Sequence, residues 1–148
     1  MTDRPGRFAA IFATGYAAHT VADHWVQTHR QATVKAKPGA DGARACATHV
    51  AALTATQAAA MAAAAATLGM RFNPRRAALA LALNAATHYI LDRRRPLHRL
   101  AALLGKDDFA NLGDPLTAPT GTGAYALDQS AHIAVLWIAA LIATGSTR

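Results

Sequence analysis

The feature that most limits the fold of this chain is a set of four long apolar segments without Lys or Arg. They cover residues 8–28, 45–70, 77–92 and 124–144. Each is about as long as a bilayer-spanning helix needs to be, although the third reaches that length only with its flanks. No segment shows the alternating β-branched pattern of a strand. The sequence therefore predicts an all-α protein in which a four-helix bundle makes a single domain over residues 1–148.

The placement of charge favours a membrane protein over a nucleic-acid-binding protein. The formal net charge is +7, and the basic residues lie almost entirely in the connections between the apolar segments. A DNA-binding helix would carry a basic stripe along its length, whereas charge confined to the ends of apolar segments is typical of flanks that meet lipid headgroups. A soluble bundle also needs a charged outer face on each helix, and residues 77–91 contain no charged side chain. We therefore expect a multi-pass protein of the cell membrane, with the lipid bilayer as its main partner.

The connections predict one further helix and two loops. In the connection 93–123, apolar and basic side chains separate onto two faces of a short helix, with Leu97, Leu100, Ala101 and Leu104 opposite Arg99 and Lys106. Such a helix suits the membrane interface between the third and fourth apolar segments. Residues 29–44 are expected to form a basic loop. Asn73-Pro74 predicts a tight connection that makes the second and third segments an antiparallel hairpin.

Asp and His recur four residues apart in three of the four apolar segments. The pairs are His19 with Asp23, His88 with Asp92, and Asp128 with His132, and the second segment adds His49. This spacing stacks the two side chains of a pair on one face of a helix, one turn apart. Buried ionisable groups are costly unless they are paired or bound to metal. Their repetition in otherwise uncharged segments therefore predicts a shared polar site inside the bundle.

Imidazole and carboxylate groups together favour a divalent metal, with zinc first and iron or manganese as alternatives. The candidate ligands are His19, Asp23, His49, His88, Asp92, Asp128 and His132. Seven candidates exceed the three or four protein ligands of one zinc. Either two metals bind, or some of the seven contact and orient the ligands without binding the metal themselves. Glu is absent, and the His–Asp spacing is one residue longer than in di-iron bundles. A ferritin-like centre is therefore disfavoured.

Three amide side chains lie next to these pairs in the sequence, namely Gln27, Asn84 and Gln129. Gln27 is one turn beyond Asp23, and Asn84 is one turn before His88. Amides in these positions either orient metal ligands or make hydrogen bonds between helices without a metal. Both readings stay open at the level of the sequence.

Four motifs in a fixed order resemble those of a bacterial family of small membrane proteins of unknown function. They are "HTVADHWVQT", "THVAAL", "THYILD" and "LDQSAH", which match a pattern of HxxxDxxxQ, a single His, HxxxD and DQxxH. The resemblance covers residues 15 to about 140. It implies four membrane helices around a polar, metal-binding centre, similar in design to membrane-bound metal-dependent hydrolases. The matching positions are His19, Asp23, Gln27, His49, His88, Asp92, Asp128, Gln129 and His132. The helices here are richer in Ala than is usual in that family, and the resemblance supplies no substrate.

Three functions remain open from the sequence. The first is a metal-dependent hydrolase in the membrane, acting on a lipid-like, phosphoester or other small-molecule substrate, with Asp23 or Asp128 as the general base. The second is a non-enzymatic membrane protein that uses the cluster as a proton or ion relay or as a structural polar core. The third is a soluble helical metal-dependent phosphohydrolase, although the adjacent His-Asp dipeptide of that class is reversed at 23–24. Nucleic acid is a disfavoured partner, and a homo-oligomer is compatible with all three functions.

Overall fold

The computed structural model describes residues 4–145, and every regular element within that range is helical. The four long helices are α1 (Arg4–Val21), α3 (Gly39–Leu68), α4 (Pro74–Asp92) and α7 (Gly123–Ala143). The shorter α-helices are α2 (His29–Val34), α5 (Arg95–Leu103) and α6 (Asp107–Ala110). A π-helical turn (Ala22–Val26) follows α1, and a 3-10 turn (Pro119–Gly121) precedes α7. The prediction of an all-α protein is therefore confirmed for the described part of the chain.

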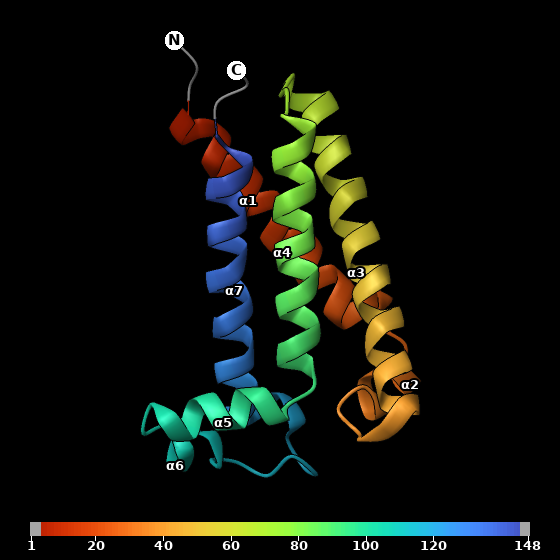
Figure 1. Cartoon of the computed structure of the whole chain (residues 1–148), viewed down its shortest axis with the longest axis vertical. Helices are drawn as coiled ribbons and strands as arrows, with labels where there is room; N and C mark the ends of the chain where they lie inside the picture. The colour runs from red at the N-terminus through yellow and green to blue at the C-terminus, as the bar shows by residue number, and fades with distance from the viewer. Residues whose placement is uncertain (1–3, 146–148) are drawn as a thin grey trace.

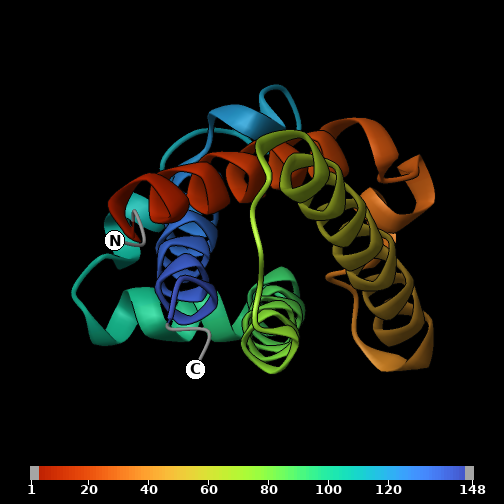
Figure 2. The same cartoon turned by 90° about the horizontal axis from the view of Figure 1, so that it is seen from above.

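The long helices pack into one bundle whose two ends differ. α4 and α7 lie side by side, α3 packs against α4, and α1 crosses obliquely behind them to contact both α3 and α7 (Figures 1 and 2). The start of α1, the end of α7 and the α3–α4 connection lie at one end of the bundle (Figure 1). α2, α5 and α6 lie at the other end, which we call the α5 end.

Two predicted boundaries were wrong in the first half of the chain. The predicted helix 8–28 is interrupted, because the α-helix ends at Val21 and the π-helical turn leads to an extended backbone at Gln27. The predicted basic loop 29–44 contains α2 and the first turns of α3. A reciprocal capping box between Thr28 and Gln31 begins α2. Asp41 in the first turn of α3 interacts favourably with the positive end of the helix dipole.

The second half of the chain follows the predicted boundaries closely. Asn73 caps α4 by accepting hydrogen bonds from the backbone N–H groups of Arg75 and Arg76, and Pro74 occupies the first turn. The predicted tight connection between α3 and α4 is therefore confirmed. The predicted short helix between the third and fourth segments is α5, which lies across the ends of α4 and α7 (Figure 1). α5 buries Leu97 and Ala101 against the bundle.

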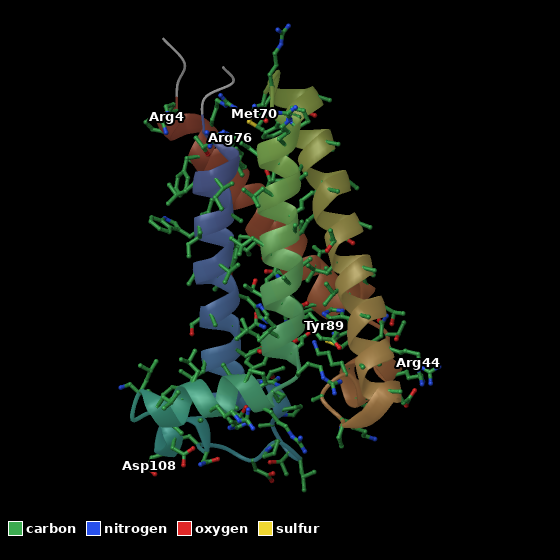
Figure 3. The ribbon with its side chains drawn as sticks, viewed as in Figure 1. Arg4, Arg44, Met70, Arg76, Tyr89 and Asp108 are labelled. Atoms are coloured by element: carbon green, nitrogen blue, oxygen red, sulfur yellow. The ribbon has the colours of Figure 1, made fainter. Side chains whose placement is uncertain are left out.

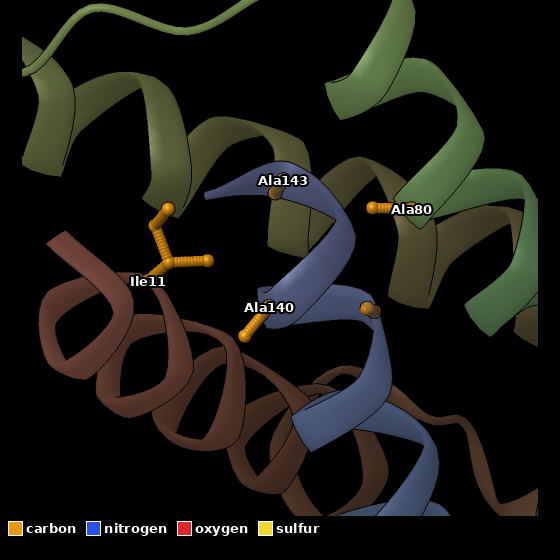
Figure 4. Close-up of a cluster of buried hydrophobic side chains, with 5 residues drawn as sticks. Ile11, Ala80, Ala140 and Ala143 are labelled. Atoms are coloured by element: carbon orange, nitrogen blue, oxygen red, sulfur yellow. The ribbon is translucent and has the colours of Figure 1, made fainter. Parts of the chain in front are cut away.

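The interior of the bundle contains mainly small apolar side chains and polar groups. A cluster at the end opposite α5 consists of Ile11 from α1, Ala80 from α4 and Ala139, Ala140 and Ala143 from α7 (Figure 4). Such small residues let the helix backbones approach closely. The largest fully buried side chains are Leu53, His19, His49, His88, His132, Asp92 and Cys46. The centre of the molecule is therefore unusually polar for a small helical protein.

Two of the long helices, Gly39–Leu68 and Gly123–Ala143, are long and apolar enough to cross a membrane, by length and composition. The other two, α1 and α4, carry arginines in their first turns, including Arg7 and Arg75. Charged side chains gather at both ends of the bundle, with Arg4 and Arg76 at one end and Arg44 and Asp108 at the other (Figure 3). The structure thus gives two candidate spans where the sequence predicted four.

Candidate metal centre

The seven predicted ligands come from five elements and converge near the α5 end of the bundle. His19 lies in the last turn of α1, and Asp23 lies in the π-helical turn that follows. The remaining ligands are His49 of α3, His88 and Asp92 of α4, and Asp128 and His132 of α7. Six of the seven are buried, and Asp23 is the most exposed, with 9% of its side chain accessible. The structure therefore places all seven candidates in one cluster.

Three atoms in this cluster, from His49, His88 and Asp92, have nearly equal separations, and an oxygen of Asp23 lies close to two of them. The Nε2 atoms of His49 and His88 are 3.1 Å apart. Asp23 Oδ1 is 3.2 Å from His49 Nε2 and 3.6 Å from His88 Nε2, and Asp92 Oδ2 is 3.4 Å and 3.2 Å from the same two nitrogens. Ligands at 2.0–2.2 Å around a tetrahedral zinc lie about 3.4 Å from one another. His49 Nε2, His88 Nε2 and Asp92 Oδ2 therefore have the spacing of three ligands in a tetrahedral set.

A second group of ligand atoms adjoins the first through Asp92. Asp92 Oδ2 faces His49 and His88, whereas Asp92 Oδ1 lies 3.9 Å from His132 Nε2. His132 Nε2 is in turn 3.6 Å from Asp128 Oδ1. Asp92, Asp128 and His132 could hold a metal ion, as could His49, His88 and Asp92, and a third group consists of His19, Asp23 and His88. The second group is the more open of the two, because its separations exceed those of a tetrahedral set.

Several buried polar atoms of the cluster make no hydrogen bond. They are both ring nitrogens of His19, Nδ1 of His88, Nε2 of His132, Oδ1 of Asp23 and of Asp128, and Oδ2 of Asp92, which forms an ion pair with Lys35. A buried polar atom without a partner costs about 1–3 kcal/mol, so most buried groups in folded proteins are paired. A cation in the centre would engage nitrogen lone pairs and carboxylate oxygens of this kind. The residues present therefore fit a divalent metal.

The charge balance of the centre also suits a cation. Three carboxylates, those of Asp23, Asp92 and Asp128, lie in the cluster, and two cationic side chains approach them. Lys35 Nζ is 2.9 Å from Asp92 Oδ2, with a side chain that is only 12% exposed. Arg94 is less close, with NH1 3.9 Å from Asp128 Oδ1. Carboxylates therefore outnumber cations, and one of the two cations is outside hydrogen-bond distance.

The amide side chains take different roles. Asn84 Nδ2 donates a 2.7 Å hydrogen bond to Oε1 of Gln57, a residue of α3 that the sequence reasoning missed. Gln57 lies two turns beyond His49 on the same face, which is the one signal that could have identified it. Gln129 Nε2 is 3.4 Å from Asp128 Oδ2, and the buried Nε2 of Gln27 makes no hydrogen bond.

Lys35 was also missed, because it lies in the connection between α2 and α3, where no helical period fixes its position. Arg93 holds this connection against the end of α4 by donating hydrogen bonds to the carbonyl oxygens of Lys35 and Lys37. The chain's other imidazoles stay outside the centre, as expected. His24, for example, is exposed and contacts the carbonyl oxygen of Thr20 and the hydroxyl of Tyr125.

The model of one protein family matches residues 11–148, a range that includes every residue of the centre. The chain belongs to family DUF3307. This family is described as proteins of unknown function, which agrees with the family type that the motifs resemble. Membership of DUF3307 assigns neither a metal nor a membrane location. Neither the curated proteins nor the solved structures compared with the chain contain a match. The function of this DUF3307 protein therefore has to be argued from its own residues.

Proposed function

We propose that this DUF3307 protein is a multi-pass membrane protein with a zinc centre that hydrolyses an ester bond in a lipid-like substrate. The observation that carries the proposal is the 3.1–3.4 Å spacing of His49 Nε2, His88 Nε2 and Asp92 Oδ2, which matches three ligands of a tetrahedral zinc. Two imidazoles and a carboxylate are the protein ligands of a known type of catalytic zinc site, which keeps its fourth position open. We assign His49, His88 and Asp92 as these three ligands.

Asp23 is the general base in this proposal. Its Oδ1 lies beside the three ligands, 3.2 Å from His49 Nε2 and 3.6 Å from His88 Nε2, and its side chain is the most exposed of the cluster. His19 Nε2, 3.5 Å from Asp23 Oδ2, helps to orient the carboxylate. A bound zinc ion would supply the charge that lowers the pKa of a water to about 7. The π-helical turn that carries Asp23 is a type of distortion found frequently at functional sites.

The chain's own residues account for the proton in the hydrolysis. Asp23 takes a proton from the attacking water, whose oxygen forms a bond to the ester carbonyl carbon. The bond from that carbon to the alcohol oxygen then breaks, and the proton held by Asp23 passes to the leaving alkoxide. The products are a carboxylic acid and an alcohol. Asp128 and His132, beside Asp92, line the centre and provide further contacts for a polar headgroup.

The outer surface of the bundle supports a membrane location. Residues 8–22, 45–70, 77–91 and 129–143 contain no Asp, Lys or Arg. Large apolar side chains on these segments face outward, including Leu79, Ile90, Trp137 and Leu141, which are 46–58% exposed. The shortest of these uncharged segments are about 22 Å long, less than the usual hydrocarbon thickness of about 30 Å. The arginines at their ends therefore have to extend towards the headgroups.

A proton or ion relay is less well supported than a hydrolase. A relay needs polar groups along the whole path through the bundle. The polar residues of the interior extend from Asp92 through His88 to the Asn84–Gln57 pair. Beyond that pair the interior contains the cluster of Ile11, Ala80 and the alanines of α7, and the buried hydroxyl of Thr144 donates to the backbone of its own helix. This apolar end would block a path for protons or ions.

The test is hydrolysis of p-nitrophenyl esters by zinc-loaded protein in lipid nanodiscs, with bis-p-nitrophenyl phosphate as the phosphoester comparison. Asp23→Asn should retain zinc and lower kcat by about 10²–10⁴-fold, the usual contribution of a general base. Asp41→Asn, in an exposed ion pair with Arg30, is the matched control and should leave kcat unchanged. Loss of zinc from Asp23→Asn would show that Asp23 is a ligand instead. Zinc binding without hydrolysis of either ester type would overturn the proposed activity.

A further inference from the structure

A cavity lies directly beyond the histidines, on the side away from α5. Its volume is about 70 Å³. Gly15, Asn84 and Leu136 line it and lie one helical turn from His19, His88 and His132 respectively. Ile11, Ala80 and Ala140, shown in Figure 4, form its far wall. The cavity therefore continues the interior of the bundle from the candidate metal centre towards the opposite end.

One polar atom on the wall of this apolar cavity has no partner. Gln57 lines the cavity and is 97% buried, since its exposed fraction is 3%. Its Oε1 accepts the hydrogen bond from Asn84 Nδ2, whereas its Nε2 makes no hydrogen bond. Such an unpaired buried donor is unusual and needs an acceptor. Both N–H groups of Gln57 Nε2 are therefore unpaired in a wall that is otherwise apolar. The atom itself is buried, so an acceptor in the cavity reaches it when the Gln57 amide turns towards the cavity.

We propose that the cavity binds an acyl chain and that Gln57 Nε2 donates a hydrogen bond to the carbonyl oxygen of its ester. This inference rests on the proposed hydrolase and names its substrate class as an acyl ester. The cavity has room for about five water-sized groups, which corresponds to the first methylene groups of a chain. An alkyl segment suits walls made of Ala, Ile, Leu, Met and Phe side chains, because apolar cavities exclude water.

The remainder of the chain has a path to the bilayer. Met61 of α3, Phe72 of the α3–α4 connection and Leu81 of α4 line the cavity and are partly exposed. A chain longer than the cavity passes between α3 and α4 at these residues and continues among the lipid tails. The ester itself then lies at the Gln57–Asn84 pair, with Asn84 one turn, or about 6 Å along the helix, from His88.

The probe for this proposal is the methyl ester of a fatty acid with a photoreactive diazirine on carbon 6, added to protein in nanodiscs. Crosslinked residues are mapped by mass spectrometry, first with zinc and then on a zinc-free His88→Ala variant. We expect labelling of residues that line the cavity, such as Met61 and Leu81, in both samples. Because this readout does not need zinc, it remains valid if the proposed metal or hydrolase function fails.

Two sets of variants make the test specific. Ala80→Phe fills the cavity and should reduce labelling at Met61 and Leu81 at least tenfold, whereas Ala86→Phe, on the exposed face of the same helix, should not. Replacing both Gln57 and Asn84 with Leu removes the polar pair without leaving either amide unpaired. This double variant should reduce labelling by the ester probe about threefold to tenfold. A second probe, an alkyl diazirine of the same length without the ester carbonyl, should label the double variant as strongly as the wild type.

The outcomes that would overturn the proposal are equally direct. Equal labelling of Ala80→Phe and Ala86→Phe would show that the probe stays in the bilayer. If the Leu double variant loses labelling by the ester probe and by the alkyl probe to the same extent, Gln57 does not recognise the carbonyl. Absence of cavity labelling in a protein that retains zinc and hydrolyses esters would reject the acyl cavity alone and leave the proposed function standing.

Discussion

Asp92 belongs to two of the three groups of ligand atoms and also contacts the nearest cation. Its carboxylate lies between the His49–His88 pair and His132, and its Oδ2 is 2.9 Å from Lys35 Nζ. The lysine stabilises a buried carboxylate that would otherwise lack a countercharge. The same ammonium group repels an incoming divalent cation. Lys35 should therefore weaken metal binding while it helps the metal-free centre to fold.

Replacement of Lys35 tests this electrostatic argument. Lys35→Met should tighten zinc binding at least tenfold, because a unit charge about 5 Å from a divalent ion contributes several kcal/mol of repulsion even at an effective dielectric constant near 20. The measurement is a competition titration against a zinc chelator of known affinity. Lys37→Met, an exposed lysine of the same connection, is the control and should change the affinity little. Unchanged or weaker zinc binding by Lys35→Met would contradict the assignment of Asp92 as a ligand.

At the scale of single residues, the sequence predicted which Asp and His side chains lie together but missed residues that surround them. The four-residue spacing of the His and Asp pairs sufficed to place their side chains on common faces, and the structure brings all seven residues together. Lys35 could not be predicted, because its position depends on how Arg93 holds the α2–α3 connection. Gln57 is paired with Asn84 across two helices, and a single sequence does not reveal that contact.

At the scale of elements, Gly42 lets the connection between α2 and α3 lie close against the first turns of α3. A Cβ atom on Gly42 would overlap the carbonyl oxygen of Lys37, which the backbone cannot easily move. This close approach lets the connection lie against α3 and places Lys35 beside Asp92. A loop was predicted at residues 29–44 because the basic residues of this region were interpreted as the charged ends of the neighbouring apolar segments. The spacing of apolar residues does not predict local features such as the capping box of Thr28 and Gln31 or the close approach at Gly42.

Two glycine substitutions measure this fit. Gly42→Ala should lower the free energy of unfolding by about 1–3 kcal/mol, the usual effect of overpacking. Gly15→Ala is the matched control within a long helix, because the nearest atom to its Cβ would be Leu136 Cδ2 at 3.7 Å. This control should be neutral or stabilising by up to about 1 kcal/mol, since Ala favours a helix over Gly. The measurement is denaturant unfolding in detergent micelles. Equal stability of the two variants would contradict the close approach of Lys37 to α3.

At the scale of the whole molecule, the distribution of charge separates the two ends from an uncharged middle. Figure 3 shows charged side chains such as Arg4 and Arg44 at opposite ends of the bundle. The outward faces between them consist of Ala and larger apolar residues such as Leu79 and Trp137. A soluble bundle would expose charged residues along these faces. The all-α architecture followed directly from the sequence, whereas the number of spans did not, because two of the four long helices begin with arginines.

Fractionation of cells tests the membrane location. The protein should remain in the membrane pellet after alkaline carbonate and high-salt washes and enter solution only with detergent, because its apolar outer faces would be in contact with lipid. A peripheral protein held by its basic ends would be released by salt, since such attraction is screened. Release by either wash would contradict the multi-pass proposal. The metal centre could still be tested independently in the released protein.

The metal content of the purified protein tests the central claim most directly. Elemental mass spectrometry should find about one zinc per chain in protein purified without chelator. A variant with both His49→Ala and His88→Ala should lose the zinc, because two of the three proposed ligands are gone. A variant with His24→Ala and His98→Ala, two imidazoles outside the centre, should keep it. Equal zinc in the two double variants, or a wild-type protein that stays metal-free when zinc is offered, would contradict the account.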